Sequence, residues 1–305
     1  MTQDILKKVL QSPRLPSLSA VAIEVVNPVQ GKDVTIQQIA DVIQHDAALS
    51  GKILKTVNSS FYGQPHTVST ISQALVVLGM NSVRALALGF SLVSPLDQSD
   101  GFDHLAFWRR SVYGSAAARA LARHTGLVQQ EEVFLGGLLQ DVGVLAMHQT
   151  LGASYSSLVE EAGTEHRKLA TLEQTSLSTD HASIGAALAE HWKLPPLLVD
   201  PIRFHETPNG APEDTLKLIY CVAVGSRVAD VCLSGDQGAA LEIYHRLVQQ
   251  WLGIGQKDAD ELIKSIHADT LELNTLFELP EGDPVNPDEI LARANDAIVQ
   301  ISLEQ

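Results

Sequence analysis

A single carboxylate, Asp141, lies within the apolar part of "EEVFLGGLLQDVGVLAMH". Its neighbours are aliphatic: Leu138, Leu139, Val142, Val144 and Leu145. Charged side chains are rarely buried in such surroundings without a partner, because an isolated carboxylate loses its hydration there. Asp141 is therefore a candidate metal ligand, catalytic group or structural hydrogen-bond acceptor.

Two of the 11 histidines stand where they could serve a site. His181 follows Asp180 at an expected helix start, and His205 lies near the end of the next helical segment, in "PIRFHE". We interpret both as buried, hydrogen-bonded or pocket-lining side chains in preference to metal ligands. His124 and His148 close earlier helices, where the helix dipole alone favours a histidine.

The motifs of several other enzyme classes are missing from the sequence. It contains no Gly-rich phosphate loop and no G-x-S-x-G. The stretch "FLGGLL" lies inside an apolar helical pattern, where Gly136 and Gly137 predict close helix packing. Cys221 and Cys232 fall three turns apart on one expected helix, too far to form a disulfide, and we interpret them as core residues.

Composition and charge limit the classes of function further. Apolar residues make up 45% of the 305 residues, and no run of about 18 of them predicts a membrane span. Because a secretory signal and a disulfide framework are both missing, we expect a cytoplasmic protein. The net charge of −15 argues against nucleic acid as a partner. It is uneven, with a net of +3 over residues 1–130 and −18 over residues 131–305.

Helical periodicity dominates the chain and predicts an all-α fold. Thr35 and Thr70 each precede a glutamine by three residues, which is the spacing of a capping box. Asp46 and Asn81 are further expected N-caps. Apolar residues recur with helical spacing over the longest segments, at about 104–125, 131–148, 180–193, 215–233 and 239–253.

The segment 91–103, which contains Pro95 and Gly101, predicts a domain boundary. It separates an N-terminal helical subdomain (1–95) from a larger helical bundle (96–255), and residues 256–305 are expected to form an acidic linker and a C-terminal amphipathic helix. Asn286 or Asp288 would start that helix. A narrow apolar stripe along it predicts a partner helix, in a homodimer or in an output domain: Ile290, Leu291, Ala294, Ala297, Ile298 and Ile301.

The loop "NSSFYG" places two aromatic residues directly after a helix end. Phe61 and Tyr62 would either cap the core or form an exposed anchor, and core capping is the simpler interpretation. Gly63 is expected to take a positive φ after them.

Several stretches together resemble the HDOD domain, in order and with its usual spacing, over about residues 12–235. They are "LPSLSAVAIEVV", "IQHDAALSGKILKTVNSSFYG", "VSTISQALVVLGMNSVRALALG", "FLGGLLQDVGVLAM" and "DHASIGAALAEHWKLPPLLVDPIRFHE". The resemblance implies an all-α bacterial signalling module whose central bundle is similar to the HD phosphohydrolase superfamily. Such modules are often joined to output domains such as diguanylate cyclases and generally lack a demonstrated hydrolase activity.

The resemblance also implies where metal ligands would stand. An HD hydrolase binds a divalent metal through a histidine, a His-Asp doublet and a distant aspartate, but here the doublet is Gln140–Asp141. The upstream histidine falls at Arg110, and the last aspartate falls at Ser226, with Asp230 one turn later. Glutamine is a weak ligand and arginine is a permanent cation. We therefore expect Asp141 to be a structural acceptor for Arg110 in an emptied metal site, with Gln140 as a second donor.

These observations favour a non-catalytic regulatory and interaction module, with no catalytic residue, metal or cofactor. The alternative is a metal-dependent phosphohydrolase of nucleotides or cyclic dinucleotides, with substitute ligands Asp141, His181, His205 and Asp230. A weaker option retains binding alone, in a pocket that holds an anionic small ligand through Arg110, Gln140, His181 and His205.

Overall fold

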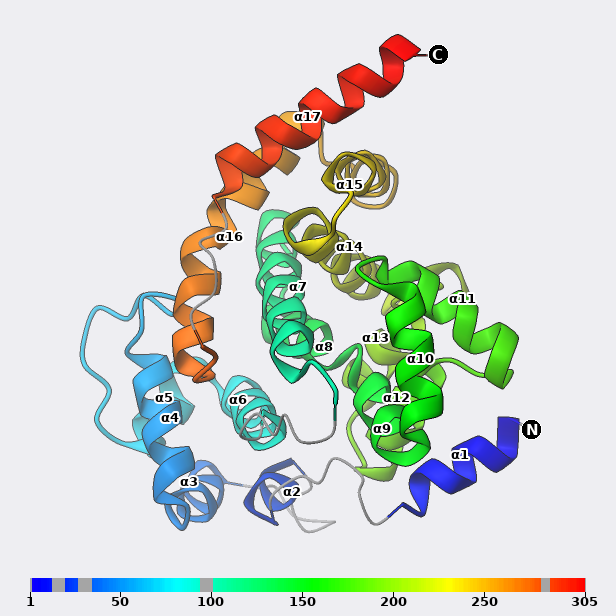
Figure 1. Cartoon of the computed structure of the whole chain (residues 1–305). Coiled ribbons are helices and arrows are strands. Elements are labelled where there is room, and N and C mark those ends of the chain that lie inside the picture. The colour runs from blue at the N-terminus through cyan, green and yellow to red at the C-terminus, as the bar shows by residue number, and fades with distance from the viewer. Residues whose placement is uncertain (1, 13–19, 27–34, 94–100, 281–285, 305) are drawn as a thin grey trace.

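The computed structural model describes residues 2–12, 20–26, 35–93, 101–280 and 286–304 (Figure 1). Within these ranges the chain forms α-helices, one short 3-10 helix and no strand. The predicted all-α fold is confirmed. Residues 94–100, which include the expected break at Pro95, lie outside the described ranges.

The central bundle is built around helices α7 (His104–His124) and α14 (Leu216–Leu233), which pack closely along each other. A Cβ atom on Gly225 would lie 2.6 Å from the carbonyl oxygen of Gly114, so this approach depends on glycine. Cys221 and Cys232 on α14 are both buried and free, as predicted. The surrounding helices are α8 (Gln130–Leu139), α9 (Val142–Leu151), α10 (Ala153–Ala162), α11 (His166–Leu177), α12 (His181–His191), α13 (Pro196–Phe204) and α15 (Gln237–Leu252).

The single helix predicted over residues 131–148 is wrong. It is interrupted after Leu139, so that Gln140 and Asp141 join α8 to α9. Asp141 has φ −97° and ψ 11°, outside the geometry of a continuing helix. Apolar residues resume directly after Gln140 and Asp141, so periodicity alone does not reveal the break. The break places Asp141 between two helices instead of on the side of one.

Three glycines set how closely the helices around Asp141 approach. A Cβ on Gly143 of α9 would lie 2.0 Å from the carbonyl oxygen of His181, at the start of α12. Gly136 and Gly137 play the packing role predicted for them, since a Cβ on either would lie 2.9 Å from an atom of a neighbouring helix. Gly143 thus lets the first turns of α9 and α12 meet, whereas Gly136 and Gly137 let α8 pack against α13 and α7.

The N-terminal helices form a second group, seen in blue and cyan in Figure 1. It comprises α2 (Ala20–Val26), α3 (Ile36–Gln44), α4 (Ala47–Val57), α5 (Ile71–Leu78) and α6 (Met80–Leu92). Helix α6 packs on α2, α4 and α5 and also on α8 of the bundle. Helix α1 (Thr2–Leu10) contacts α9 and α12, although it falls in the segment predicted as the N-terminal subdomain.

Most of the predicted helix caps are present. Thr35 forms a complete capping box, and Asp46 and Asp180 each accept a hydrogen bond from the backbone N–H three residues later. Thr70 accepts the equivalent bond, but its box is incomplete, because the reciprocal glutamine accepts from the N–H of Ser69 instead. Local pattern and local structure therefore agree at these helix starts.

The cap predicted at Asn81 is wrong. Helix α6 begins one residue earlier, at Met80, and Gly79 occupies the N-cap position with φ 85°. Gly79 also ends α5, so one residue both closes one helix and opens the next. The Asn81 side chain instead donates a hydrogen bond to Glu132 of α8, at 2.9 Å.

The segment predicted as an acidic linker begins with a long helix. Helix α16 (Gln256–Leu276) packs on α7 and α4 through buried residues that include Ile263 and Leu273. Helix α17 (Pro287–Glu304) packs along α15 and buries the first part of its apolar stripe, Ile290, Leu291 and Ala294. The side chains of Ala297, Ile298 and Ile301 lie outside the described residues. In the part of the chain that is described, every helix is too short or too polar to cross a membrane.

Candidate functional site

Four side chains from separate elements meet inside the bundle, and we call them the central cluster: Asp141, His166, His181 and His205. Asp141 comes from the break between α8 and α9, His166 and His181 begin α11 and α12, and His205 follows α13. One nitrogen or oxygen atom from each lies within 4.8 Å of the others, which would allow them to hold a metal ion. The structure thus brings three residues of the predicted pocket together and adds His166.

Oδ1 of Asp141 is the common neighbour of the three imidazole rings. It lies 3.0 Å from Nε2 of His166, 3.3 Å from Nε2 of His205 and 3.5 Å from Nε2 of His181. Nε2 of His181 and Nε2 of His205 are themselves 3.3 Å apart. Asp141, His181 and His205 are buried, so little water screens these interactions.

The ring of His181 is oriented by Glu173 of α11. Nδ1 of His181 lies 2.7 Å from Oε2 of Glu173, and the backbone N–H of His181 donates to the same oxygen at 2.9 Å. The hydroxyl of Tyr155 donates to the other carboxylate oxygen. Glu173 and Tyr155 are fully buried, so this support is rigid. The ring of His205 is fixed in the same way by the carbonyl oxygen of Ile202, 2.8 Å from its Nδ1.

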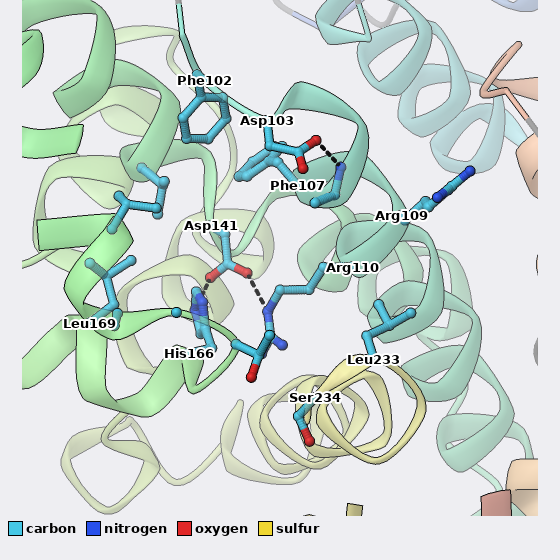
Figure 2. Close-up of a pocket in the computed structure, with 16 residues that line it drawn as sticks. Phe102, Asp103, Phe107, Arg109, Arg110, Asp141, His166, Leu169, Leu233 and Ser234 are labelled. Carbon is cyan, nitrogen blue, oxygen red and sulfur yellow. Dashed lines mark hydrogen bonds and ion pairs between the residues drawn. The ribbon is translucent and has the colours of Figure 1, made fainter. Parts of the chain in front are cut away.

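Arg110 of α7 lies beside Asp141, as the sequence predicts. Its Nε is 3.5 Å from Oδ2 of Asp141 (Figure 2). Its Nη1 pairs with Asp230 at 2.6 Å, and its Nη2 donates to the hydroxyl of Ser226 at 2.8 Å. Ser226, at the expected position of the last metal ligand of an HD hydrolase, and Asp230, one turn later, therefore both bind the guanidinium group.

A second arginine extends this network along α14. Arg227 pairs with Asp230 at 3.1 Å and with Glu206 at 3.2 Å. Oε1 of Glu206 is also 3.8 Å from Nε2 of His166 and 3.8 Å from Nε2 of His205. The central cluster is thus bordered by two arginines and their carboxylates.

Burial and neighbouring charges shift the pKa values of the cluster in different directions. Burial would raise the pKa of Asp141, but His166 and a second imidazole hold it well below its usual range. Burial would lower the pKa of His181, but the carboxylate of Glu173 outweighs it and raises the pKa to about 10. Burial and the nearby Arg110 lower the pKa of His166. These shifts favour the charged forms of Asp141 and His181 and the neutral form of His166.

A cavity of about 450 Å³ opens beside the cluster (Figure 2). Arg110, Asp141 and His166 form its polar end. Its walls are largely apolar and include Phe102, Phe107, Leu169 and Leu233. A charged end and an apolar wall together suit a small ligand that has an anionic group on an apolar body.

Gln140 is the one predicted pocket residue that the structure does not bring to the cluster. Its side chain is fully buried and faces α7, with Nε2 3.4 Å from the position that a Cβ of Gly114 would take. Among the described residues, neither amide atom of Gln140 has a hydrogen-bond partner. The expected donation from Gln140 to Asp141 is therefore not found.

Sequence reasoning missed four residues of the site: His166, Glu173, Glu206 and Arg227. A signal existed for two of them, because His166, Leu169 and Glu173 recur at the spacing of one helix face. A buried leucine on that face places the histidine and the glutamate inward as well. Glu206 and Arg227 have no such signal, since they become neighbours only when α13 and α14 pack.

Comparison with known proteins decides the family. The HDOD domain model matches residues 15–208, most of the segment that shows the resemblance. This chain belongs to the HDOD domain family. A protein of Treponema pallidum (strain Nichols) with no assigned function is 28% identical to this HDOD chain over 210 residues. The match covers 68% of this chain and 41% of the relative, so the chain spans less than half of that relative's length.

Solved structures share the fold over nearly the whole chain. A Shewanella amazonensis SB2B protein, provisionally named a phosphohydrolase, is 26% identical with a TM-score of 0.70, and the match covers 90% of this chain and 98% of that one. An HDOD domain protein of unknown function from Geobacter sulfurreducens is 20% identical with a TM-score of 0.65, and the match covers 91% of this chain and 98% of that one. The second likeness concerns the fold alone. Both support the HD-like helical architecture expected from the sequence.

Proposed function

We propose that this HDOD chain is a non-catalytic signal-transduction module, in which the HD-like centre binds and transmits a signal without hydrolysing a substrate. One observation carries the proposal: Arg110 lies where an HD hydrolase would bind metal. Its guanidinium group is 3.5 Å from Asp141 and 2.6 Å from Asp230. Asp141, which remains from such a site, and Asp230 are thus both partners of a fixed cation.

The electrostatics of this arrangement oppose a hydrolytic metal at the same place. The charge of Arg110 is permanent, and a divalent ion between Asp141 and Asp230 would meet that charge at close range. Gln140 supplies no ionised ligand, and its side chain faces away toward α7. The cavity next to Arg110 fits a regulatory ligand with an anionic group, whose binding would bear on α7, α11 and α14.

A hydrolysis screen tests the proposal. Purified protein would be incubated with nucleoside triphosphates, nucleoside monophosphates and cyclic dinucleotides in the presence of Mn²⁺, Fe²⁺ or Mg²⁺. We expect no turnover above that of the Asp141→Ala variant, which is the matched control for contaminating hydrolases. Turnover that disappears in Asp141→Ala would overturn the non-catalytic assignment.

A metal-dependent phosphohydrolase is the second candidate, and a specific observation favours it. Three histidines and an aspartate converge next to an accessible cavity, and the provisional name of the Shewanella protein agrees with such chemistry. This candidate requires a ligand set other than the HD doublet and a coordination position open to water. In the same screen it predicts turnover that depends on added metal and on His205 as well as Asp141.

The partner of such a module would be an output or signalling protein domain, or a second copy of the chain held through the C-terminal helix. The first part of the apolar stripe packs on α15 within the chain, so Ile290, Leu291 and Ala294 are already covered. Light scattering after size exclusion tests this, on the full chain and on a chain ending at residue 280. An oligomeric state that is the same for both would exclude pairing through α17.

A further inference from the structure

The central cluster places hydrogen-bond acceptors against one another. The carbonyl oxygen of Ile202 can only accept, so Nδ1 of His205, 2.8 Å away, must carry the proton. In the neutral ring this leaves a lone pair on Nε2. Glu173 fixes His181 in the same sense, with Nδ1 of the ring 2.7 Å from the carboxylate. Both Nε2 atoms are directed at Oδ1 of Asp141, which also accepts.

This arrangement requires a positive charge at its centre. With neutral rings, the Nε2 atoms of His181 and His205 would face each other at 3.3 Å with no proton between them. A proton on His181 satisfies one of these contacts. A metal dication would satisfy all of them together, because every inward-facing atom is then a ligand.

The spacing of the four atoms matches a tetrahedral ion. Bonds of roughly 2.0–2.1 Å in a tetrahedral zinc site place its ligand atoms about 3.3 Å apart. The separations from Oδ1 of Asp141 to the three Nε2 atoms are 3.0, 3.3 and 3.5 Å, and the separation between two of the Nε2 atoms is 3.3 Å. Four of the six separations among the ligand atoms thus have values close to those of a tetrahedral site, and all four atoms lie within 4.8 Å of one another.

The surrounding charges also match a dication. Two guanidinium groups, of Arg110 and Arg227, pair with the carboxylates around the cluster. Four carboxylates line or support the cluster: Asp141, Glu173, Glu206 and Asp230. The two arginines balance two of these four negative charges, and the remaining two equal the charge of one dication. Arg110 approaches Asp141 at Oδ2, whereas the histidines approach at Oδ1, so the arginine does not occupy the ligand position.

We propose that Asp141, His166, His181 and His205 bind one tetrahedral transition-metal dication of the Zn²⁺ class. This departs from the expectation that Asp141 serves without metal. Of the Gln140–Asp141 doublet, the proposed site uses only Asp141, and the three other ligands are histidines. Four protein ligands leave no open position for water, which is the mark of a structural or regulatory site. Because the ligands come from α11, α12, the end of α13 and the α8–α9 break, the ion would tie these elements together.

Cobalt binding tests the site without any assay of activity. Tetrahedral Co²⁺ absorbs visible light far more strongly than octahedral Co²⁺. Protein dialysed against chelator and titrated with Co²⁺ should reach saturation at one equivalent, and Zn²⁺ should displace the colour. Glu173→Gln, which alters only the support of His181, should weaken binding by about 10–100-fold. His205→Ala and His166→Ala remove ligands and should weaken it more.

His245→Gln is the matched control, because His245 pairs with Asp260 at 2.7 Å on the α15 and α16 helices, away from the cluster. It should bind Co²⁺ like the parent chain. Thermal melts of each metal-free variant establish that it is folded, and His166→Ala, at the start of α11, is the change best tolerated. The proposal is overturned by absence of saturable tetrahedral absorption in the parent chain, or by absorption that survives in folded His166→Ala and His205→Ala. Turnover in the hydrolysis screen would refute the non-catalytic function without contradicting the metal site. The two proposals can therefore be rejected independently.

Discussion

Two polar clusters of this HDOD chain contrast in how their atoms are partnered. The loop clamp joins the "NSSFYG" loop to α7, α8 and α16 through Ser60, Phe61, Tyr62, Arg119, Glu131 and Glu272. In it, the carboxylate of Glu272 accepts from the backbone N–H of Ser60 at 2.8 Å, from the Ser60 hydroxyl at 2.5 Å and from the N–H of Phe61 at 2.6 Å. Glu272 thus provides an acceptor for all three of these donors.

Arg119 completes the loop clamp. Its Nε donates to Glu131 at 3.0 Å, and its guanidinium carbon lies 4.1 Å from the ring centroid of Phe61. The hydroxyl of Tyr62 donates to the same glutamate at 2.9 Å. Phe61 is buried and Gly63 has φ 57°, so the predicted core-capping aromatic and the predicted glycine conformation are both confirmed.

The central cluster is partnered less completely. Among the described residues, Oδ2 of Asp141 and Nε of Arg110 have no hydrogen-bond partner, although they face each other at 3.5 Å. Three imidazole nitrogens point at one carboxylate oxygen. Buried polar atoms are normally satisfied within the fold. The contrast indicates that the loop clamp serves the fold, whereas the central cluster is arranged for something that binds.

Asp230→Ala is the change expected to cost most stability, because Asp230 is a shared partner of Arg110 and Arg227. Its loss leaves buried guanidinium groups short of an anion, and we expect the free energy of unfolding in urea to fall by about 3–5 kcal/mol. The comparison variant is Glu131→Ala in the loop clamp. There Arg119 keeps the carbonyl of Phe61 and two aromatic rings, so a smaller loss of about 1–2 kcal/mol is expected. Equal losses of unfolding free energy in Asp230→Ala and Glu131→Ala would contradict the contrast between the central cluster and the loop clamp.

The same variant predicts a pH dependence. Burial would raise the pKa of Asp230, but Arg110 and Arg227 outweigh it and lower the pKa below the ordinary value of 3.8. The stabilisation from the ionised carboxylate is therefore present above pH 3.8 and is lost as the pH falls through the lowered pKa. The stability difference between the parent chain and Asp230→Ala should narrow in that acidic window and stay constant above it. A stability difference that grows as the pH falls would contradict the predicted direction of this pH dependence.

Gly143→Ala should be the next most damaging change. Its Cβ would lie 2.0 Å from the carbonyl oxygen of His181, and backbone cannot yield as a side chain can. We expect a loss of about 3 kcal/mol in urea unfolding, together with weakened Co²⁺ binding, as α9 and α12 move apart. Gly51→Ala in α4 is the control, since a Cβ there meets nothing within 4 Å. It should gain about 0.5–1 kcal/mol from helix propensity.

Glu272→Gln tests the loop clamp alone. The amide keeps an oxygen acceptor but loses the charge that strengthens three hydrogen bonds. Because Glu272 is half-exposed, we expect a loss of only about 1 kcal/mol in urea unfolding. Co²⁺ binding at the central cluster should not change. A coupled loss of metal affinity would show that the two regions do not act independently.

The fold could be predicted largely from the sequence because its signals are local. Capping at Thr35, Asp46 and Asp180 depends on residues within one turn. The apolar helical pattern predicted the core, and the paired glycines of "FLGGLL" predicted close packing. The break after Leu139 escaped prediction because neither Gln140 nor Asp141 is a glycine or proline and apolar residues resume directly after them. There tertiary contacts, including that of Gly143 with α12, override the local pattern.

The candidate site could be predicted only in part. Arg110 and Asp141 were placed together through the family resemblance, which carries information on tertiary position. His166 comes from a charged segment. Gly163 marks the end of α10, but the contact of His166 with Asp141 depends on how α11 then packs, which no local pattern encodes. Gln140 was placed in the pocket from its position in the doublet, but the helix break turns its side chain toward Gly114.

Gln140→Leu should have a small effect of the opposite sign. The buried amide has no hydrogen-bond partner among the described residues, so its desolvation is uncompensated. A leucine of similar volume removes that penalty, and we expect the chain to gain about 1 kcal/mol in urea unfolding with unchanged Co²⁺ binding. Asn58→Leu is the opposite case, because the Asn58 amide bonds to Leu54 and Val68, and it should lose stability. If Gln140→Leu destabilises the chain instead, the Gln140 amide makes a stabilising hydrogen bond in the folded protein. The central cluster would then extend to the doublet position, and its contrast with the loop clamp would shrink.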